Sequence, residues 1–319
     1  MIFMNVILGS GIVGLLAKEI LGDSWTVIPF TKSRFYTWNP ALDDNFIIAD
    51  SDIDPFINEL MNRRPNLYPY KRSWSIMGDL KSEYDEALCT VWLSKIFSGN
   101  YPQHALAYYK DRQILSVYDI RANELYERLL NKHMPSIAEE YKKGKVTKIG
   151  DHKIERGNHI IEYDKIVSTI PLYALLEFMG KKANLEYKPI NYIHLYSEHL
   201  DFEGANQTLV VDNNIDFFKV SNISKNKYLF YFHENVVNYG AYLMNYIKDF
   251  DILDGTVVGD AIPVGSMPNL DTLEKDDIFC VGSYAQWDWC ADVGSNIKRL
   301  IKYSNRSNKP AKPKVFNEF

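Results

Sequence analysis

Near its start the chain carries a glycine pattern, Gly9-Ser10-Gly11-Ile12-Val13-Gly14, between two apolar segments. Residues 6–8, before the glycines, form a short apolar run typical of a buried parallel strand, and residues 15–21 continue with helical spacing. A turn at Gly22-Asp23 and an apolar run over 25–28 follow. This order of strand, helix and strand places the glycines where a dinucleotide pyrophosphate binds.

Each glycine of the pattern has its own expected role. Gly9 permits a tight turn, Gly11 lets phosphates approach the backbone, and Gly14 lets the helix pack closely against the strand. The backbone amides at the helix N-terminus would face the negative charge. The alternative interpretation is a glycine-rich core turn that binds no ligand.

One residue of the usual pattern is missing. Roughly 20 residues after the glycines, an acid normally binds the adenosine ribose. This chain has Pro29-Phe30-Thr31 at that position. The residues that could replace the acid, or reach a phosphate instead, are Thr31, Ser33, Lys32 and Arg34.

A second unit of strand, glycine turn and helix lies near the other end of the chain. Residues 278–281 predict a strand, Gly282-Ser283 its turn, and residues 293–303 a helix with Ile297, Leu300 and Ile301 on one face. Between the two glycine units, residues 144–176 alternate as short strands and end in Thr169-Ile170-Pro171. We therefore expect one domain built from separate parts of the chain.

These three pieces, in this order, resemble the flavoprotein superfamily that includes amine oxidases, protoporphyrinogen oxidase and UDP-galactopyranose mutase. The stretch GSYAQWDW, residues 282–289, is similar to the G-R-x-A-x-W/Y-x-Y segment of the mutase-like branch. The resemblance implies an α/β fold, with a Rossmann-like FAD-binding domain made of a parallel sheet and a β-meander. It also implies an inserted α+β substrate domain that contains an antiparallel sheet, and FAD as the cofactor.

The resemblance assigns the FAD contacts to several segments. The first glycine motif would hold the pyrophosphate, Val146 would contact the adenine through its backbone, and the final helix would begin beside the flavin N1–C2=O edge. Ser283 stands where the family often has an arginine. The residues assigned to FAD, by resemblance or by position, are Gly9, Ser10, Gly11, Ile12, Val13, Gly14, Thr31, Arg34, Val146, Thr169, Gly282, Ser283, Asp292 and Val293.

The same pieces divide the chain. Residues 1–42, 111–180 and 264–308 are predicted to form the FAD-binding domain, residues 43–110 and 181–263 the substrate domain, and residues 309–319 a flexible tail. Within the substrate domain, the pattern predicts a helix over 80–97. It also predicts antiparallel strands over 209–211, 217–220 and 228–233, which would floor a pocket beside the flavin.

Several residues of the predicted substrate region are candidates for substrate contact. The tract with Tyr68, Tyr70, Lys71, Arg72 and Trp74 mixes cations with aromatic rings, which suits an anionic or nucleobase-bearing substrate or, alternatively, a plain loop. The remaining candidates are Trp287 and Trp289, which follow the late glycine and could instead be core residues, and Tyr231 and His233 at the end of a predicted strand.

Composition excludes other classes. The formal net charge of −5 argues against broad capture of nucleic acid or of an anionic membrane. Three cysteines without C-x-x-C spacing, and histidines without a ligand spacing, lead us to expect no disulfide framework and no metal. No targeting or membrane-spanning segment is predicted, so we expect a cytoplasmic protein.

The leading functional hypothesis is an FAD-dependent oxidoreductase of amine-oxidase type that acts on a small polar or nucleotide-like substrate. In such an enzyme the cofactor supplies the redox chemistry, which agrees with the absence of an obvious acid–base motif. One alternative is a non-redox flavin-dependent mutase that resembles UDP-galactopyranose mutase. The other is a binding protein without catalysis that retains the FAD scaffold.

Overall fold

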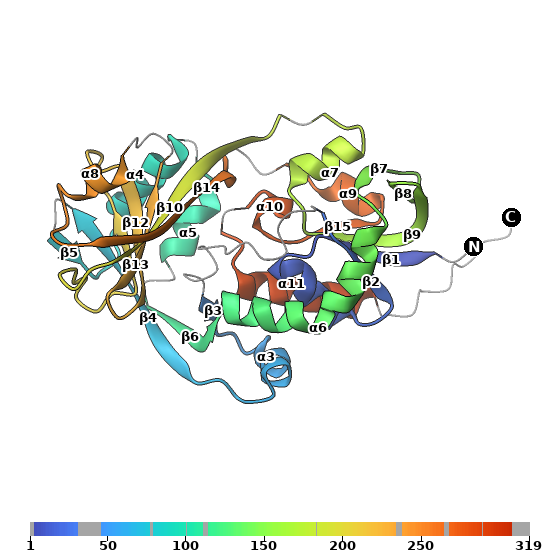
Figure 1. Cartoon of the computed structure of the whole chain (residues 1–319), viewed down its shortest axis with the longest axis horizontal. Coiled ribbons are helices and arrows are strands. Elements are labelled where there is room, and N and C mark those ends of the chain that lie inside the picture. Colours follow the sequence, from blue (N-terminus) through green and yellow to red (C-terminus); the bar gives the residue numbers. More distant parts are fainter. Residues whose placement is uncertain are drawn as a thin grey trace, which may run out of the picture.

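The computed structural model describes residues 3–30, 46–76, 79–99, 101–110, 114–182, 184–233, 238–264, 268–288 and 290–307. These residues form two sheets, each covered by helices, which lie side by side in Figure 1. Thr31, Ser33, Lys32 and Arg34, which were predicted to bind the adenosine end of FAD, lie outside the described residues, as do Trp289 and the predicted tail. No helix in the described part of the chain has both the length and the apolar character that a bilayer crossing requires.

The first sheet contains the predicted Rossmann-like unit. Its strands are β1 (Met4–Leu8), β2 (Trp25–Ile28), β7 (Val146–Gly150), β8 (Lys153–Arg156), β9 (His159–Ser168) and β15 (Ile278–Cys280). The order is β2-β1-β9-β8-β7, and β15 also pairs with β9. β2, β1, β9 and β15 are parallel, whereas β7, β8 and β9 form an antiparallel meander, so the predicted fold class is confirmed.

Helices cover both faces of this sheet, as is usual for parallel strands. Helices α1 (Ile12–Leu21), α6 (Ala122–Lys142) and α11 (Val293–Ser307) share one apolar core that contains Leu15, Leu125 and Ile297. Helices α7 (Leu172–Phe178), α9 (Asp271–Lys275) and α10 (Ser283–Gln286) pack into a second core on the other side, with Leu175 and Leu273.

The second sheet is mostly antiparallel. Its strands are β3 (Phe46–Ile48), β4 (Leu67–Ile76), β5 (Asp79–Lys81), β6 (Ile114–Arg121), β10 (Glu186–Tyr196), β11 (Gln207–Val210), β12 (Phe217–Ser224), β13 (Lys227–Phe232) and β14 (Asp251–Val264). The order is β14-β10-β13-β12-β11-β4-β6-β3, with β5 beside β4. The three strands predicted between 209 and 233 are therefore confirmed as β11, β12 and β13.

Further helices complete the fold. Helices α4 (Glu86–Phe97) and α5 (Gln103–Lys110) share a core with Leu209 and Phe218, while α8 (Tyr239–Leu243) shares a different core with Phe217 and Phe230. Alternate residues of these strands thus enter cores on opposite faces of the sheet. Helix α3 (Asp54–Met61) instead packs into the core of α1 and α6.

Two local predictions were wrong. The helix predicted over 80–97 begins only at Glu86, because the side chain of Asp85 accepts hydrogen bonds from the first free amides, and Leu80 lies in β5. The tract from Tyr68 to Trp74 lies in strand β4 rather than in a loop. Pro69 is tolerated there because that part of β4 pairs with β6 alone among the described strands.

The sheet pairing divides the chain at different points from the predicted boundaries. Strand β6, within the range predicted for the FAD-binding domain, pairs with β3 and β4 of the second sheet. Conversely Ile47, Ile53 and Ile57, within the range predicted for the substrate domain, are fully buried in the core of α1, α6 and α11. The segment after residue 46 therefore contributes to both cores.

Candidate functional site

The carboxyl ends of the four parallel strands meet at one edge of the first sheet. Leu8, Ile28, Ser168 and Cys280 are the last residues of these strands and lie in register. The predicted FAD segments start directly after them: the amide of Gly9 donates to the Ile28 carbonyl at 2.8 Å. Open α/β sheets bind ligands at this edge.

The geometry of the first turn fits the three glycine roles. Gly9 has φ +103°, a conformation that favours glycine. A Cβ atom on Gly14 would lie 2.1 Å from the carbonyl oxygen of Gly9, so only glycine allows α1 to approach β1 this closely. A Cβ atom on Gly11 would meet no atom of the described residues within 4 Å. A phosphate that approaches the backbone at Gly11 needs this open space, whereas Gly14 needs the absence of a side chain for close packing of the helix.

The N-terminus of α1 presents its amides without a side-chain cap. Gly11 is the N-cap residue, and no side chain of the described residues caps this end of the helix. The side chains of Ile12 and Val13 pack against the apolar core, which leaves their backbone to line the turn after Ser10. Uncapped amides at the positive end of a helix form a ready anion site.

Thr169 and Val146 support this edge from within the protein. The Thr169 hydroxyl donates to the Leu8 carbonyl at 2.9 Å, and a Cβ atom on Gly9 would lie 2.4 Å from that hydroxyl. Thr169 thus braces the glycine turn. Val146 begins β7 and is 6% exposed, with its side chain in the core.

The late glycine turn meets the early one. Gly282 has φ +106°, and a Cβ atom placed on it would lie 3.8 Å from the side chain of Val13. Residues that are far apart in the sequence therefore meet at one point. The Ser283 hydroxyl donates to the Ala291 carbonyl at 3.2 Å, so this side chain closes its own loop, and the loop leads to the start of α11.

Asn296 organises this loop, a role that the sequence did not reveal. Its side-chain oxygen accepts hydrogen bonds from the amide of Gly282 and from Gln286, both at 2.9 Å. Its side-chain nitrogen donates to the carbonyls of Ala291 and Asp292. Asn296 is 2% exposed, so one buried amide side chain joins the Gly282 turn to the residues that lead into α11.

Asp292 caps α11. Its Oδ1 accepts the amide of Ser295 at 2.8 Å, and its Oδ2 accepts a hydrogen bond of 3.4 Å from the Tyr108 hydroxyl on α5. Val293, the first residue of the helix, is 7% exposed. The predicted cap is present, and it also connects the final helix to the helices of the second sheet.

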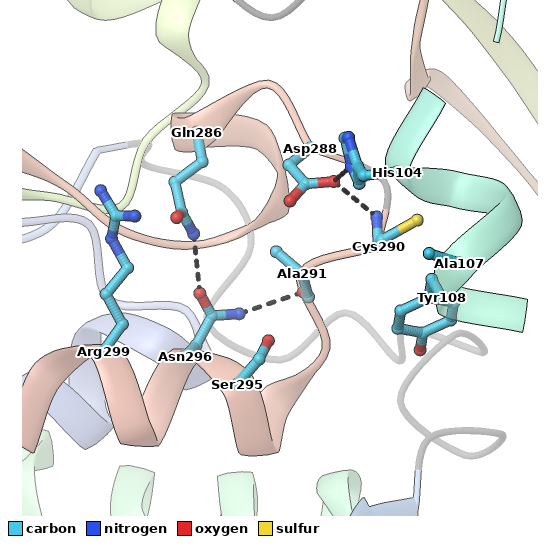
Figure 2. A pocket seen from close by; sticks show the side chains of 10 residues that line it. All are labelled: His104, Ala107, Tyr108, Gln286, Asp288, Cys290, Ala291, Ser295, Asn296 and Arg299. Atoms are coloured by element: carbon cyan, nitrogen blue, oxygen red, sulfur yellow. Dashed lines mark hydrogen bonds and ion pairs between the residues drawn. The ribbon is translucent and has the colours of Figure 1, made fainter. Parts of the chain in front are cut away.

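A cavity of about 450 Å³ opens between α5 and this loop (Figure 2). Small-molecule pockets commonly have about 300–1,000 Å³. The residues that line the cavity are His104, Ala107, Tyr108, Gln286, Asp288, Cys290, Ala291, Ser295, Asn296 and Arg299. None of them comes from the strands over 207–232 that were predicted to floor the pocket, so helix α5 takes that place.

Three chemically active side chains meet in this cavity. Nε2 of His104 lies 2.9 Å from Oδ1 of Asp288, and the same oxygen accepts the amide of Cys290 at 2.9 Å. In Figure 2, dashed lines join Asp288 both to His104 and to Cys290. The possible ligand atoms of the three lie within 4.8 Å of one another. Sequence spacing could not predict this group, because residue 104 is 184 positions away from residue 288.

Arg72 lies behind the cavity rather than in it. It is 8% exposed, its Nε donates to the Gln207 side chain at 2.9 Å, and its guanidinium lies 5.1 Å from the ring centre of Tyr109 and 5.8 Å from that of Tyr108. The predicted substrate-binding cation is therefore a buried group that supports α5.

The other substrate candidates do not line the cavity. Trp74 is fully buried, Tyr231 is 2% exposed beneath the ammonium of Lys219, and the exposed Lys71 lies on β4. Trp287 is 4% exposed and its indole donates to the Val264 carbonyl at 3.2 Å, which makes it a core residue. His233 is half-buried, and burial lowers its pKa to about 4, with Lys188 and Lys95 adding to the shift.

Comparison with known proteins supports the fold. No protein-family model and no curated protein sequence matches the chain. Among solved structures, reduced UDP-galactopyranose mutase matches with a TM-score of 0.66 at 10% identity, over 96% of this chain and 94% of that one.

Two further solved structures extend the comparison. Cyclohexylamine oxidase from Brevibacterium oxydans matches with a TM-score of 0.60 at 10% identity, over 95% of this chain and 98% of that one. A fatty acid isomerase from P. acnes, described as producing CLA, matches with a TM-score of 0.59 at 11% identity, over 94% and 98%. The fold expected from the resemblance is thus confirmed, because the chain shares it with a solved mutase, an amine oxidase and a fatty acid isomerase.

Proposed function

We propose that this chain binds FAD and is an FAD-dependent oxidoreductase of amine-oxidase type that acts on a small polar substrate. The observation that carries the proposal is the meeting of the Gly9–Gly14 turn with the Gly282 turn at the carboxyl edge of the parallel strands. Space at Gly11 and uncapped amides at α1 are features that the pyrophosphate of FAD needs.

Different segments of the chain would bind the cofactor and the substrate. The amides of the first turn of α1 and the Gly282 turn would hold the pyrophosphate, and the amides at the start of α11 would lie beside the flavin. Bound FAD would supply the redox chemistry by accepting a hydride from a C–N or C–C bond. His104, whose Nε2 lies 2.9 Å from Asp288, lines the cavity and would contact the substrate there.

The substitution Gly11→Val tests the cofactor assignment. Gly11 has φ −70°, which valine adopts, and the valine Cβ would meet no atom of the described residues within 4 Å, so the variant is expected to fold. It should lose FAD, because the side chain would fill the path of the pyrophosphate. The measurement is flavin absorbance after purification, together with a titration of the apoprotein with FAD. Full flavin occupancy in this variant would show that the turn is only a core turn.

A non-redox mutase is the second candidate, favoured by the GSYAQWDW stretch and by the fold shared with UDP-galactopyranose mutase. Anaerobic mixing of the FAD-loaded protein with a panel of small amines separates the two. Loss of the oxidised flavin absorbance supports the oxidoreductase. An absorbance that no amine changes, together with isomerisation of a nucleotide sugar only after chemical reduction of the flavin, supports the mutase.

A binding protein without catalysis remains the third possibility of this scaffold. It predicts FAD binding without either reaction. The tract around Arg72 and Trp74, which first suggested a nucleobase substrate, is mainly a buried strand and lends that substrate no support. We therefore keep the small polar substrate as the proposal.

A further inference from the structure

A second cavity, of about 660 Å³, follows α11 away from its N-terminus. It lies between this helix and the segment of β9, α9 and β15, and it adjoins the first cavity at Ser295 and Arg299. The residues that line it are Lys165, Glu274, Asp277, Ile278, Phe279, Ser295, Lys298, Arg299, Lys302, Tyr303 and Arg306. Apart from Ser295 and Arg299, which also line the first cavity, these side chains have no role in the proposed FAD-dependent reaction.

The lining is rich in cations, and most of them form no ion pair with a described residue. Lys298 pairs with Asp50 and Asp52 at 3.0 and 2.7 Å. Within the described residues, no carboxylate lies in ion-pair distance of the other four cations, Lys165, Arg299, Lys302 and Arg306. Against the two carboxylates of the lining, these four leave an excess of two positive charges in a chain whose formal net charge is −5.

Arg299 is the group with the strongest need for a partner. Its Nε is buried and has no hydrogen-bond acceptor among the described residues, and its guanidinium lies 4.9 Å from the ring centre of Phe279. Burial lowers the pKa of Arg299; Glu274, Cys280 and Asp288 oppose this shift, and Arg306 adds to it. A buried donor without an acceptor is costly, so an anion beside Arg299 would be stabilising.

The dipole of helix α11 explains only some of the cations in this cavity. Cations in the last turns of a helix interact favourably with its dipole, which explains Lys302 and Arg306. It does not explain Arg299, in the middle of α11, or Lys165, which reaches the same cavity from β9. Phe279 and Tyr303, stacked with ring centres 4.3 Å apart, add an aromatic wall.

We propose that this second cavity binds a phosphorylated small molecule, with Arg299, Lys302, Arg306 and Lys165 around the phosphate. A phosphate monoester carries nearly two negative charges at neutral pH, which matches the excess positive charge of the lining. The guanidinium forks of arginine suit phosphate oxygens, and the volume lies in the range of small-molecule pockets. This site is independent of the proposed FAD-dependent reaction.

Calorimetric titration with inorganic phosphate tests the proposal. The titration is made in the Gly11→Val background, so that binding at the early glycine turn does not contribute. We expect the single variant Arg299→Gln to weaken phosphate binding about tenfold or more, and the double variant Lys302→Gln with Arg306→Gln to do the same. Each variant loses one or two charge-assisted hydrogen bonds to the phosphate. The double variant changes exposed positions, so it reports on binding even where Arg299→Gln fails to fold.

The control variant is Lys225→Gln with Lys227→Gln, which makes the same change of charge at exposed positions outside both cavities. It should bind phosphate as tightly as the parent. Equal weakening of phosphate binding in the control variant would overturn the proposal. So would the absence of saturable binding up to about 10 mM phosphate, a concentration above the range of a millimolar dissociation constant. Tighter binding of a single-stranded oligonucleotide, lost in the same cavity variants, would also overturn it in favour of a polyanion groove.

Discussion

The backbone amide of Gly282 donates a hydrogen bond of 2.9 Å to the side-chain oxygen of Asn296, which lies 14 positions further along the chain. This bond fixes the late glycine turn to the first turns of α11. Because a Cβ on Gly282 would contact Val13, the same bond also sets the distance between the late turn and the early one. The proposed FAD site therefore depends on a buried amide side chain that has no expected contact with the cofactor.

Replacement of Asn296 by leucine should destabilise the protein by about 2–4 kcal/mol, because the Gly282 amide and the Gln286 side chain lose the oxygen that accepts their hydrogen bonds in a buried site. Urea denaturation of the apoprotein measures this loss. The matched change Asn245→Leu, at an exposed position, should alter the free energy of unfolding by less than about 0.5 kcal/mol. Equal effects of both changes would contradict the role assigned to Asn296.

Substitution of Gly14 by alanine should lower stability by about 2 kcal/mol or more, although alanine normally favours a helix. The added Cβ would overlap the Gly9 carbonyl and force α1 away from β1. Gly11→Ala is the control, since its Cβ would meet nothing and its φ of −70° suits alanine. A Gly14→Ala protein as stable as the control would show that the two elements can separate without cost.

Asp292 both caps helix α11 and accepts a hydrogen bond from Tyr108, and two different substitutions separate these roles. Asp292→Ser keeps an N-cap for α11 and removes the contact with Tyr108, whereas Asp292→Ala removes both. We expect Asp292→Ala to cost about 1 kcal/mol of stability and Asp292→Ser only a few tenths. If the start of α11 lies beside the flavin, both variants should also shift its reduction potential, measured by titration with a reference dye. An unchanged potential in both would limit Asp292 to capping.

Ala107→Trp tests whether the 450 Å³ cavity takes the substrate. Ala107 is exposed on α5 and lines the cavity, so an indole there should fill the space with little effect on stability. FAD content should stay unchanged, while the amine that reduces the flavin in the parent protein should no longer do so. The control is Ala138→Trp on α6, at a position that lines neither cavity. Full reduction in Ala107→Trp would place the substrate elsewhere.

His233 predicts how stability depends on pH. Its pKa is about 4 in the folded protein, whereas the unfolded chain has a value of about 6.5, so on acidification the unfolded chain takes up a proton first. Stability should therefore fall as the pH drops from about 6.5 toward 4, by about 1–2 kcal/mol at pH 5. His233→Gln should remove this part of the loss. His199→Gln, at an exposed histidine, should leave the profile unchanged.

The sequence predicted the first sheet well because its signals are local. The apolar runs before Gly9 and Gly282, and the helical spacing after Gly14, are contained within about twenty residues each. Strands β11, β12 and β13 were predicted for the same reason, since short turns separate them. Where a local signal had two meanings, as in the aromatic tract from Tyr68 to Trp74, only the pairing of β4 with β6 and β11 decided that it is a strand.

The residues around the 450 Å³ cavity escaped prediction because their signal is not local. His104 on α5 and Asp288 after α10 are joined by a hydrogen bond between distant segments, and neither has a motif around it. For Trp287 the local signal pointed to a contact that the structure does not show. Its position after the late glycine suggested contact with a ligand, whereas packing and the hydrogen bond to the Val264 carbonyl hold its ring in the core.

By itself, the sequence determined the two glycine turns and the elements around them, because positive φ angles, close backbone approach and hydrophobic period are properties of short segments. The tertiary structure alone decided what lies next to them. It brought Val13 against Gly282 and Tyr108 against Asp292, and it buried the Nε of Arg299 where no described residue accepts its hydrogen bond. These contacts follow from how helices and strands pack across the whole chain, where burial and sheet pairing outweigh local preference.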